Sequence, residues 1–377
     1  MMLNFNGALL KKIEISSDAL QNNIAVIREN LSPGTQLCCI VKSNAYGHGL
    51  ENIIEVIEPY ADAFGIVDLK EAAIIRKKGI RKKIINIGCT LPEFADTSVE
   101  LQISPHIYTI NTVKALAISA LKQGKQIEVF VKLETGMNRC GVAGKELEEI
   151  LQFISSSKEL IFAGFVTHFA EADTADSEFT RLQIERFENL RKKYLTKYSI
   201  DDFSHTANTG ATFMYPESHY NMVRVGLGIY GMSPSNCVYN AGAHRLTQVL
   251  EYKSKIIQIH KVKKNHSVSY SGIWTAPKDS VIAIIPIGYA DGFSRALSNR
   301  GHVIINDQRA PVVGRVCMNN FAVDITHIKN VLLYTEVTII SRNKKFGITV
   351  DDIAKSLNTI NYEVTTVIPE RIPRLTI

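Results

Sequence analysis

The stretch QLCCIV (residues 36–41) is an uninterrupted apolar run that ends abruptly at Lys42. A run of this length is too short for an ordinary helix and predicts a strand buried on both faces. A second run, AFGIV (residues 63–67), is followed at residues 68–78 by apolar positions spaced three or four apart, which predicts a helix. Alternation of buried strands with helices is typical of a parallel sheet.

The same alternation continues to about residue 231. Eight strands are expected, at Gln36–Val41, Ala63–Val67, Lys83–Ile87, Gln102–Tyr108, Ile127–Glu134, Ile161–His168, Phe203–Ala207 and Met222–Ile229. Helical patterns lie between them, at Asp68–Lys78, Thr112–Lys122, Lys145–Ile154 and Glu178–Tyr194. Eight repeats over roughly 200 residues favour an N-terminal (β/α)8 barrel of the TIM type over an open doubly wound sheet.

The pattern changes after about residue 240. Short β-type segments separated by turns are expected at Thr247–Lys264, Ser280–Gly288, His302–Asp307, Ala310–Asp324 and Val331–Ser341, with one short helix at about Thr349–Leu357. We therefore expect an α/β chain with a barrel over residues 1–240 and a mostly-β C-terminal domain over residues 241–377. The early strand Lys11–Ile15 could pair with either domain, so the first ~15 residues are not assigned by pattern alone.

Composition narrows the class of protein. The 377 residues are 45% hydrophobic and 21% charged, as in ordinary globular proteins. No apolar run approaches the ~20 residues of a spanning helix, and the N-terminal lysines follow the apolar patch instead of preceding it, so neither a membrane partner nor a secretory signal is expected. The net charge of +6 is scattered, which disfavours a nucleic-acid partner.

The six cysteines contain no C-x-x-C pair and no cluster with histidines at zinc spacing. We therefore expect no structural metal and a reducing compartment, the cytoplasm.

Lys42 is the first residue with an expected chemical role. Catalytic groups of barrels lie at the C-terminal ends of strands, and an apolar setting there would favour the neutral amine that Schiff-base chemistry requires. The alternative is an ordinary lysine whose chain runs along apolar surface to water.

The whole stretch VKSNAYGHG (41–49) closely resembles the cofactor-lysine segment of the alanine racemases, fold-type III enzymes that use pyridoxal 5'-phosphate (PLP). Further segments resemble the same family in the same order: VKLETGMNRCG (131–141), GFVTHFAEAD (164–173), HTANTGA (205–211), RVGLGIYG (224–231), SVSYSGIW (267–274), IGYADGFSR (287–295), VVGRVCMNN (312–320) and NYEV (361–364). The resemblance implies a barrel followed by a β domain, and an isomerase that interconverts L-alanine and D-alanine for cell-wall peptidoglycan.

Two catalytic residues follow from the resemblance. Lys42 would bind PLP covalently and serve as base on one face of the substrate Cα. Tyr270, from a neighbouring subunit of a homodimer, would serve on the opposite face. A tyrosine with a pKa near about 10 in water needs help to act as a base, and His168 and Arg224 match the residues that supply it.

The resemblance also implies a cofactor-binding set. Arg224 would donate to the pyridine nitrogen and leave it unprotonated, which favours racemisation over transamination. His205 would support Arg224. The phosphate ligands would be Tyr46, Thr209, Tyr362 and the backbone at Gly226 and Leu227.

A third set would bind alanine. Arg139 matches the arginine that contacts the cofactor phenolate and the substrate carboxylate, and Met318 matches the residue whose N–H binds that carboxylate. Lys132 matches a lysine that is often carbamylated and then orients the arginine. Tyr289 and Arg295 would line a narrow access route that selects small side chains, although serine would be poorly rejected.

Three positions depart from the family pattern: Asn319 replaces a common aspartate, Ser271 a common glycine, and Glu134 the usual aspartate of DTGM. These positions affect substrate preference and rate more than reaction class. Three alternatives remain open: a serine-preferring racemase of the same family, a fold-type III decarboxylase, and a non-catalytic PLP-binding homeostasis protein. The C-terminal domain carrying Tyr270 argues against the last.

Overall fold

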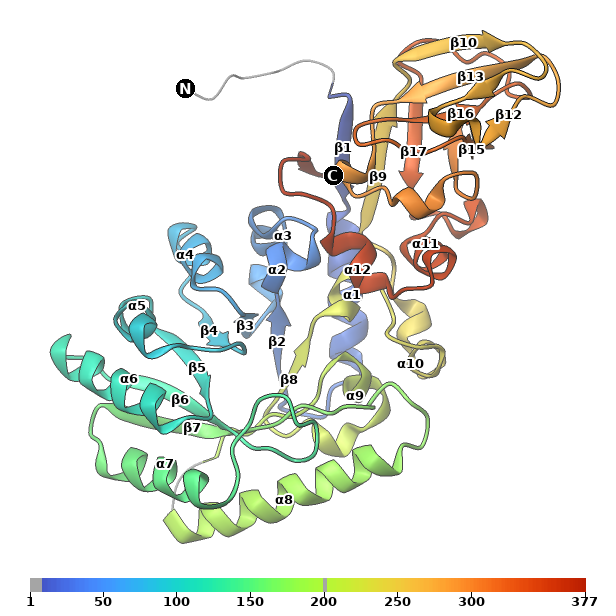
Figure 1. Cartoon of the computed structure of the whole chain (residues 1–377). Coiled ribbons are helices and arrows are strands. Elements are labelled where there is room, and N and C mark those ends of the chain that lie inside the picture. Colours follow the sequence, from blue (N-terminus) through green and yellow to red (C-terminus); the bar gives the residue numbers. More distant parts are fainter. Residues whose placement is uncertain (1–8, 199–201) are drawn as a thin grey trace. The chain divides into compact units, whose positions relative to one another are not determined.

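A computed structural model describes residues 9–198 and 202–377 (Figure 1). The chain divides into two compact units. Of the described residues, the barrel unit comprises 20–45, 53–198 and 202–246, and the C-terminal unit comprises 9–19, 46–52 and 247–377. Three helices cross a boundary between the units: α1 (Ser17–Glu29), α2 (Lys42–Tyr46) and α3 (Leu50–Ile57).

The barrel unit is built on a seven-stranded parallel sheet in the order β7-β6-β5-β4-β3-β2-β8. Its strands are β2 (Gln36–Ile40), β3 (Ala63–Ile66), β4 (Lys83–Asn86), β5 (Ile103–Ile107), β6 (Ile127–Lys132), β7 (Leu160–Val166) and β8 (Met222–Val225). Six of them are nearly continuous in buried residues, as a sheet covered on both faces requires, whereas β7 is exposed or half-buried over residues 161–163. The predicted barrel with a mostly-β C-terminal domain is confirmed.

The eighth predicted strand, Phe203–Ala207, is reduced to a single bridge between His205 and Val166. The segment nevertheless connects the two edges of the sheet. Phe203 N–H donates to the carbonyl of Ala163 in β7, and Arg224 N–H in β8 donates to the carbonyl of Ala207. The segment therefore takes the place of a strand and closes the barrel, although its pairing is too short to form a regular one.

Helices cover the outside of these strands (Figure 1). They are α4 (Leu69–Lys77), α5 (Ala95–Glu100), α6 (Ile110–Lys122), α7 (Gly144–Ser156), α8 (Glu178–Tyr198), α9 (Thr209–Met214) and α10 (Asn236–Asn240). The helix α4 begins at a capping box, because Asp68 accepts from Lys70 N–H and Glu71 accepts from Asp68 N–H. Leu116, Ile150 and Phe187 contribute to one buried cluster beneath α6, α7 and α8.

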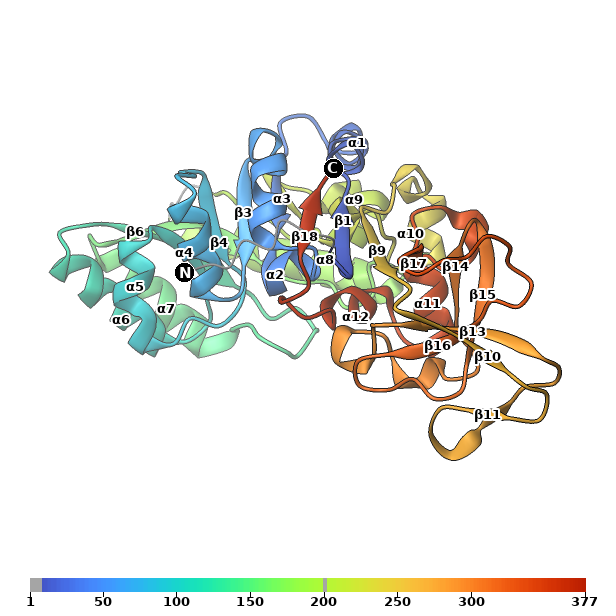
Figure 2. The same cartoon turned by 90° about the horizontal axis from the view of Figure 1, so that it is seen from above.

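The C-terminal unit contains a nine-stranded sheet in the order β10-β13-β16-β15-β14-β17-β9-β1-β18. The strands are β1 (Lys11–Ile15), β9 (Leu250–Lys255), β10 (Gln258–Val262), β13 (Ser280–Ile285), β14 (His302–Ile305), β15 (Gln308–Val313), β16 (Phe321–Asp324), β17 (Glu336–Ile340) and β18 (Arg374–Thr376). A separate hairpin joins β11 (Ser267–Val268) to β12 (Trp274–Thr275). Figure 2 shows β18, β1 and β9 side by side, in agreement with their pairing.

Two helices of this unit follow the last long strand. The predicted helix is present as α11 (Val350–Leu357), but the expectation of a single helix was wrong, because α12 (Asn361–Thr366) follows it. A helix of six residues has too few periodic positions to be recognised from its sequence. No helix in the two described ranges is long and apolar enough to cross a membrane.

Candidate active site

The first group of site residues lies at the C-terminal ends of the barrel strands. Lys42 follows β2, Lys132 ends β6, His168 follows β7, and Arg224 lies within β8. Parallel strands bring these ends to one edge of the barrel. The sequence-based prediction that polar side chains gather there is therefore consistent with the order of strands.

Arg224 is the most extensively bonded of these side chains. Its Nη1 donates to Nδ1 and to the backbone carbonyl of His205, both at 2.9 Å. Its Nη2 donates to the carbonyls of Thr167 (2.8 Å) and Thr206 (3.0 Å), and lies 3.4 Å from Nδ1 of His168. Within the described residues its fifth donor, the Nε–H, has no acceptor, so a bound ligand could take it.

The electrostatics of this network agree with its geometry. Burial lowers the pKa of Arg224 to about 10, which leaves the guanidinium protonated at neutral pH. Burial and the nearby guanidinium hold the pKa values of His168 and His205 well below the usual range, so both rings are neutral. A neutral ring can offer Nδ1 as an acceptor, as the bond from Arg224 to His205 requires.

Lys42 is followed by an unusual backbone segment. Ser43, Asn44, Ala45 and Tyr46 all have φ of 53° or 54°, which makes α2 a left-handed turn. Such a conformation costs about 1–2 kcal/mol per residue for L-amino acids. Ala45 N–H donates to the carbonyl of Val41, and Asn44 N–H donates to Oε1 of Glu71, which helps to hold the turn. Strain of this kind is concentrated at functional sites.

The amines of Lys42 and Lys132 are both less basic than an exposed lysine. Burial and the Arg139 charge lower the pKa of Lys42, partly offset by Glu71. Burial, together with the Arg224 and Arg139 charges, lowers the pKa of Lys132 to about 8. The barrel thus places Lys42, Lys132, Arg139 and Arg224 within electrostatic reach of one another.

The predicted phosphate ligands of the barrel also lie together. Gly226 N–H donates to Oγ1 of Thr209 at 3.2 Å, which holds this hydroxyl beside the backbone that leads to Leu227. Thr209 begins α9, whose cap is Asn208, accepting from Ala211 N–H. A side chain at Gly210 would meet the carbonyl of Ala172 at 2.7 Å, which explains the glycine of the HTANTGA segment.

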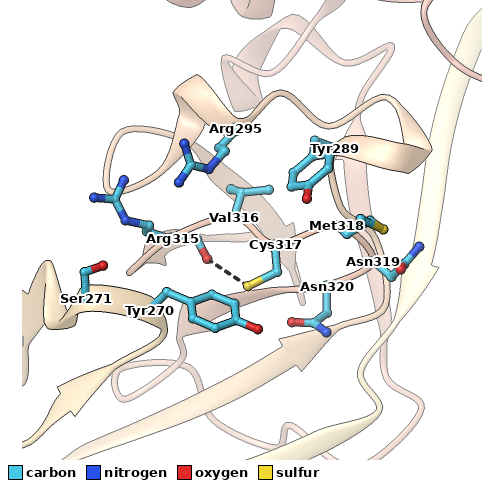
Figure 3. Close-up of a pocket in the computed structure, with 10 residues that line it drawn as sticks. All are labelled: Tyr270, Ser271, Tyr289, Arg295, Arg315, Val316, Cys317, Met318, Asn319 and Asn320. Carbon is cyan, nitrogen blue, oxygen red and sulfur yellow. Dashed lines mark hydrogen bonds between the residues drawn. The ribbon is translucent and has the colours of Figure 1, made fainter.

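The second group lines a pocket of about 560 Å³ in the C-terminal unit, which we call the Tyr270 pocket. Its lining residues are Tyr270, Ser271, Tyr289, Arg295, Arg315, Val316, Cys317, Met318, Asn319 and Asn320 (Figure 3). Four of the predicted site residues are among them. Tyr270 is 71% exposed in the single chain, and Met318 is 55% exposed.

Close backbone packing fixes the position of Met318. Tyr289 N–H donates to the carbonyl of Cys317, and Ala290 N–H donates to that of Met318. A side chain at Gly288 would lie 2.2 Å from the carbonyl of Cys317, so only glycine permits this approach. Within the described residues Met318 N–H has no backbone acceptor, as a ligand-binding donor requires.

Ser271 has a left-handed backbone conformation beside Tyr270. Its φ is 59° and that of Ser269 is 68°, so Tyr270 lies between two residues in the left-handed region. This conformation suits glycine better than serine.

Tyr46 and Tyr362 form a third group, within the C-terminal unit. Their ring centroids are 6.0 Å apart. Burial raises the pKa of the Tyr46 hydroxyl, so it remains a neutral donor. A side chain at Gly47 would meet the carbonyl of Thr365 at 2.0 Å, which places the end of the left-handed turn directly against α12.

The chain was compared with known families and structures. Residues 15–234 match the model of the alanine racemase N-terminal domain, and residues 249–376 match that of the C-terminal domain. The chain belongs to the alanine racemase family. It is 36% identical to alanine racemase 2 of Oceanobacillus iheyensis, covering 96% of this chain and 92% of that one, and 34% identical to alanine racemase 2 of Bacillus subtilis, covering 96% and 94%.

Solved structures agree with this assignment. The alanine racemase of Clostridium difficile 630 superposes with a TM-score of 0.92 at 30% identity, covering 99% of this chain and 97% of that one. The alanine racemase of Bacillus anthracis with bound L-Ala-P gives a TM-score of 0.91 at 30% identity, covering 98% and 96%. The described alanine racemase fold therefore extends over nearly the whole chain.

Sequence reasoning missed one buried group of this alanine racemase barrel. His106 in β5 is 3% exposed, and its ring centroid lies 5.4 Å from that of His205. Within the described residues neither ring nitrogen of His106 has a hydrogen-bond partner, nor has Nε2 of His205. Burial and the Arg224 and Lys132 charges hold the pKa of His106 well below its usual range. A histidine inside the apolar run ISPHI was the signal that could have revealed it.

Proposed function

We propose that the chain interconverts L-alanine and D-alanine by two-base proton transfer at Cα, with PLP as cofactor and Lys42 and Tyr270 as the bases. The observation that carries the proposal is the bonding of Arg224. Four of its N–H donors are used within the barrel, and the fifth is left for a ligand acceptor. A fixed cation with one remaining donor suits an aromatic ring nitrogen.

The barrel residues fit an anionic cofactor. Arg139 and Arg224 provide positive charge, and the hydroxyl of Thr209 with the backbone at Gly226 and Leu227 would bind phosphate, together with Tyr46 and Tyr362. PLP, when bound, withdraws electron density from Cα and so makes its proton more acidic. Arg224 would keep the ring nitrogen unprotonated, which limits side reactions, and His205 would hold Arg224 in place.

Lys42 and Tyr270 divide the proton transfer. The lowered pKa of Lys42 favours the neutral amine that removes or returns a proton on one face of Cα. Tyr270 would do the same on the opposite face, and His168 and Arg224 would help its phenolic oxygen to act as a base. Because Tyr270 is 71% exposed in the single chain, a second copy can cover it, and we propose a homodimer with sites shared between subunits.

Substrate binding would use residues of both units. Arg139 and the N–H of Met318 would bind the carboxylate, and Tyr289, Arg295 and Tyr362 would restrict the side chain to the size of alanine. Serine adds only one hydroxyl to alanine, and a small apolar side-chain pocket rejects such an addition weakly, so a serine-preferring racemase is the second candidate.

Lys132 would act by orienting Arg139. With a pKa of about 8, part of its amine is neutral at neutral pH. The neutral nitrogen can form an N–C bond with carbon dioxide and release a proton to water, which gives an anionic carbamate. We propose that this modification occurs.

We also propose that the enzyme works in the cytoplasm to supply D-alanine for peptidoglycan. The six free cysteines support a reducing compartment.

The function is tested with single enantiomers of alanine and serine in heavy water. We expect loss of optical activity and deuterium at Cα, faster for alanine than for serine. A protein that holds PLP but racemises neither amino acid would favour the non-catalytic alternative.

The shared site is tested separately with mixed subunits. In a 1:1 mixture of Lys42→Ala and Tyr270→Ala chains, activity should recover to at most about a quarter of the wild-type value, because half of the dimers are mixed and one of the two sites in each mixed dimer is intact. Absence of any recovery in dimers of confirmed composition would contradict the shared site.

A further inference from the structure

Two free cysteines lie close together at the C-terminal ends of barrel strands. Cys89 follows β4, and Cys140 lies in the loop between Glu134 and Val142 that follows β6. The strand between β4 and β6 is β5, and Tyr108 follows it directly (Figure 1). The hydroxyl of Tyr108 lies within hydrogen-bond distance of both thiols. Three neighbouring strands therefore bring two thiols to one hydroxyl.

The strand pairing supports this placement independently. Asn86 in β4 pairs with Pro105 in β5, and the same register continued by three residues places Cys89 beside Tyr108. On the other side of β5, the register with β6 places Lys132 beside Tyr108. The second thiol acts electrostatically on Lys132, so it lies near this lysine. The two thiols thus lie on the two sides of one tyrosine.

The backbones of the two cysteines are held differently. Thr90, next to Cys89, accepts from Nδ2 of Asn86 at 2.9 Å, and its carbonyl accepts from the hydroxyl of Thr112 at 3.0 Å. Within the described residues no backbone hydrogen bond holds Cys140 itself. If the two thiols approach each other, we therefore expect the loop of Cys140 to move.

Two other cysteines of the barrel are unsuited to reaction with each other. Cys38 and Cys39 are adjacent in β2, so their side chains point to opposite faces of the strand. Burial raises the pKa of the Cys38 thiol to about 12 and also raises that of Cys39. The thiolate is the reactive form, so both remain inert.

From this arrangement we infer that Cys89 and Cys140 form an oxidation site, at which hydrogen peroxide produces an intramolecular disulfide. One thiolate attacks an oxygen of the peroxide, the O–O bond breaks, and a sulfenic acid and one water form. The other thiolate attacks that sulfur, the S–O bond breaks, and the S–S bond forms as a second water leaves. The two thiols lose two electrons, which reduce one peroxide to two waters.

The disulfide would displace Arg139, which directly precedes Cys140. Strands β4 and β6 are two strand spacings apart, about 9–10 Å. The Cα atoms of a disulfide are only about 4.4–6.8 Å apart, so the loop must move toward Cys89 and take Arg139 with it. Racemisation would slow because Arg139 binds the substrate carboxylate, and this effect alone rests on the proposed function.

The test treats the PLP-loaded dimer with hydrogen peroxide and maps its disulfides by mass spectrometry. We expect one Cys89–Cys140 disulfide in each chain, a loss of racemisation of about tenfold or more, and recovery with dithiothreitol. Cys89→Ser and Cys140→Ser should each prevent the disulfide and keep most of their activity at the same dose. Cys237→Ser is the matched control, because Cys237 lies in α10 of the same unit, and it should respond like the wild type.

Each outcome decides the inference. Absence of the disulfide at a dose that oxidises a free thiol in the same solution would overturn it, as would a disulfide between subunits. An equal loss of activity in Cys140→Ser would show that peroxide acts elsewhere. A disulfide that leaves the rate unchanged would contradict the displacement of Arg139. If the disulfide forms but the untreated protein does not racemise alanine, the oxidation site stands and the proposed function fails.

Discussion

Arg224 in the barrel and Arg315 in the C-terminal unit are the same type of residue in opposite surroundings. Arg224 is 5% exposed and donates to three carbonyls and a histidine nitrogen. Arg315 lines an open pocket and has no carboxylate partner in the described part of the chain. Hydrogen bonds formed on folding offset the cost of burying the Arg224 charge. The charge in the Tyr270 pocket still lacks such partners, and a ligand or another subunit would supply them.

Because of this difference, substitutions in the two regions should affect different properties of the protein. Substitutions in the barrel group should change cofactor binding and folding together, because the same contacts serve both. Substitutions in the Tyr270 pocket should change catalysis or ligand affinity and leave the folded unit intact.

Lys42→Ala should have the largest effect. Without its amine the barrel has neither the covalent attachment nor the first base, so racemisation should fall by about a thousandfold or more. The visible absorbance of covalently bound PLP should disappear as well. Lys125→Ala is the control, because Lys125 is exposed and precedes the start of β6, at the opposite end of that strand from the site residues. Persistence of the absorbance in Lys42→Ala would show that another lysine binds PLP.

Tyr270→Phe should lower racemisation by about a hundredfold to ten-thousandfold, because one face of Cα loses its base. Its melting temperature and PLP absorbance should match the wild type, in contrast with Lys42→Ala. Tyr334→Phe provides the comparison, since Tyr334 is 64% exposed in the same unit and lies outside the pocket. A comparable loss in both variants would remove Tyr270 from the mechanism.

Substitutions of Arg224 and Arg315 test directly whether the two regions differ in their contribution to folding stability. Arg224→Gln leaves the carbonyls of Thr167 and Thr206 without donors, so the free energy of unfolding should fall by about 3 kcal/mol. Arg315→Gln should change it by less than about 0.5 kcal/mol, as for most surface positions. Urea denaturation of both proteins gives the two values. Similar changes at the two positions would show that the Tyr270 pocket contributes to folding as much as the barrel network does.

The sequence predicted the strands of the barrel more accurately than it predicted the geometry of the candidate active site. Periodicity located the seven regular barrel strands within a few residues, because buried parallel strands are continuous apolar runs. It could not reveal the left-handed turn after Lys42, since Ser, Ala and Tyr do not favour that conformation and tertiary contacts must hold it. The strand at Phe203–Ala207 was overestimated because a single bridge closes the barrel.

A pH experiment on Lys132 tests whether burial in the barrel prepares its amine to form a carbamate. Carbamate forms only from the neutral amine, which becomes dominant as pH rises through its pKa of about 8. The carbamate signal from labelled bicarbonate, observed by carbon NMR, should therefore grow about threefold or more between one pH unit below that value and one unit above. Lys132→Ala should abolish the signal. A signal that is constant over this range would contradict the role of burial in preparing the amine.

The smallest effect is expected at His106, which tests whether the buried histidines limit stability in acid. Below a pH of about 6.5 the unfolded chain takes up a proton at each histidine. Buried His106 does not, because its pKa lies well below that value in the folded state. Stability should therefore fall as pH falls, by up to about 1.4 kcal/mol per pH unit for each such group.

His106→Leu removes this contribution and two nitrogens that have no partner among the described residues, so its free energy of unfolding should equal or exceed the wild-type value. Its loss of stability from pH about 6.5 to about 5.5 should be smaller by roughly 1 kcal/mol. Urea titrations of both proteins at the two pH values give the difference. An unchanged acid sensitivity would mean that His106 is protonated in the folded barrel, where its proton would then need an acceptor beside Arg224.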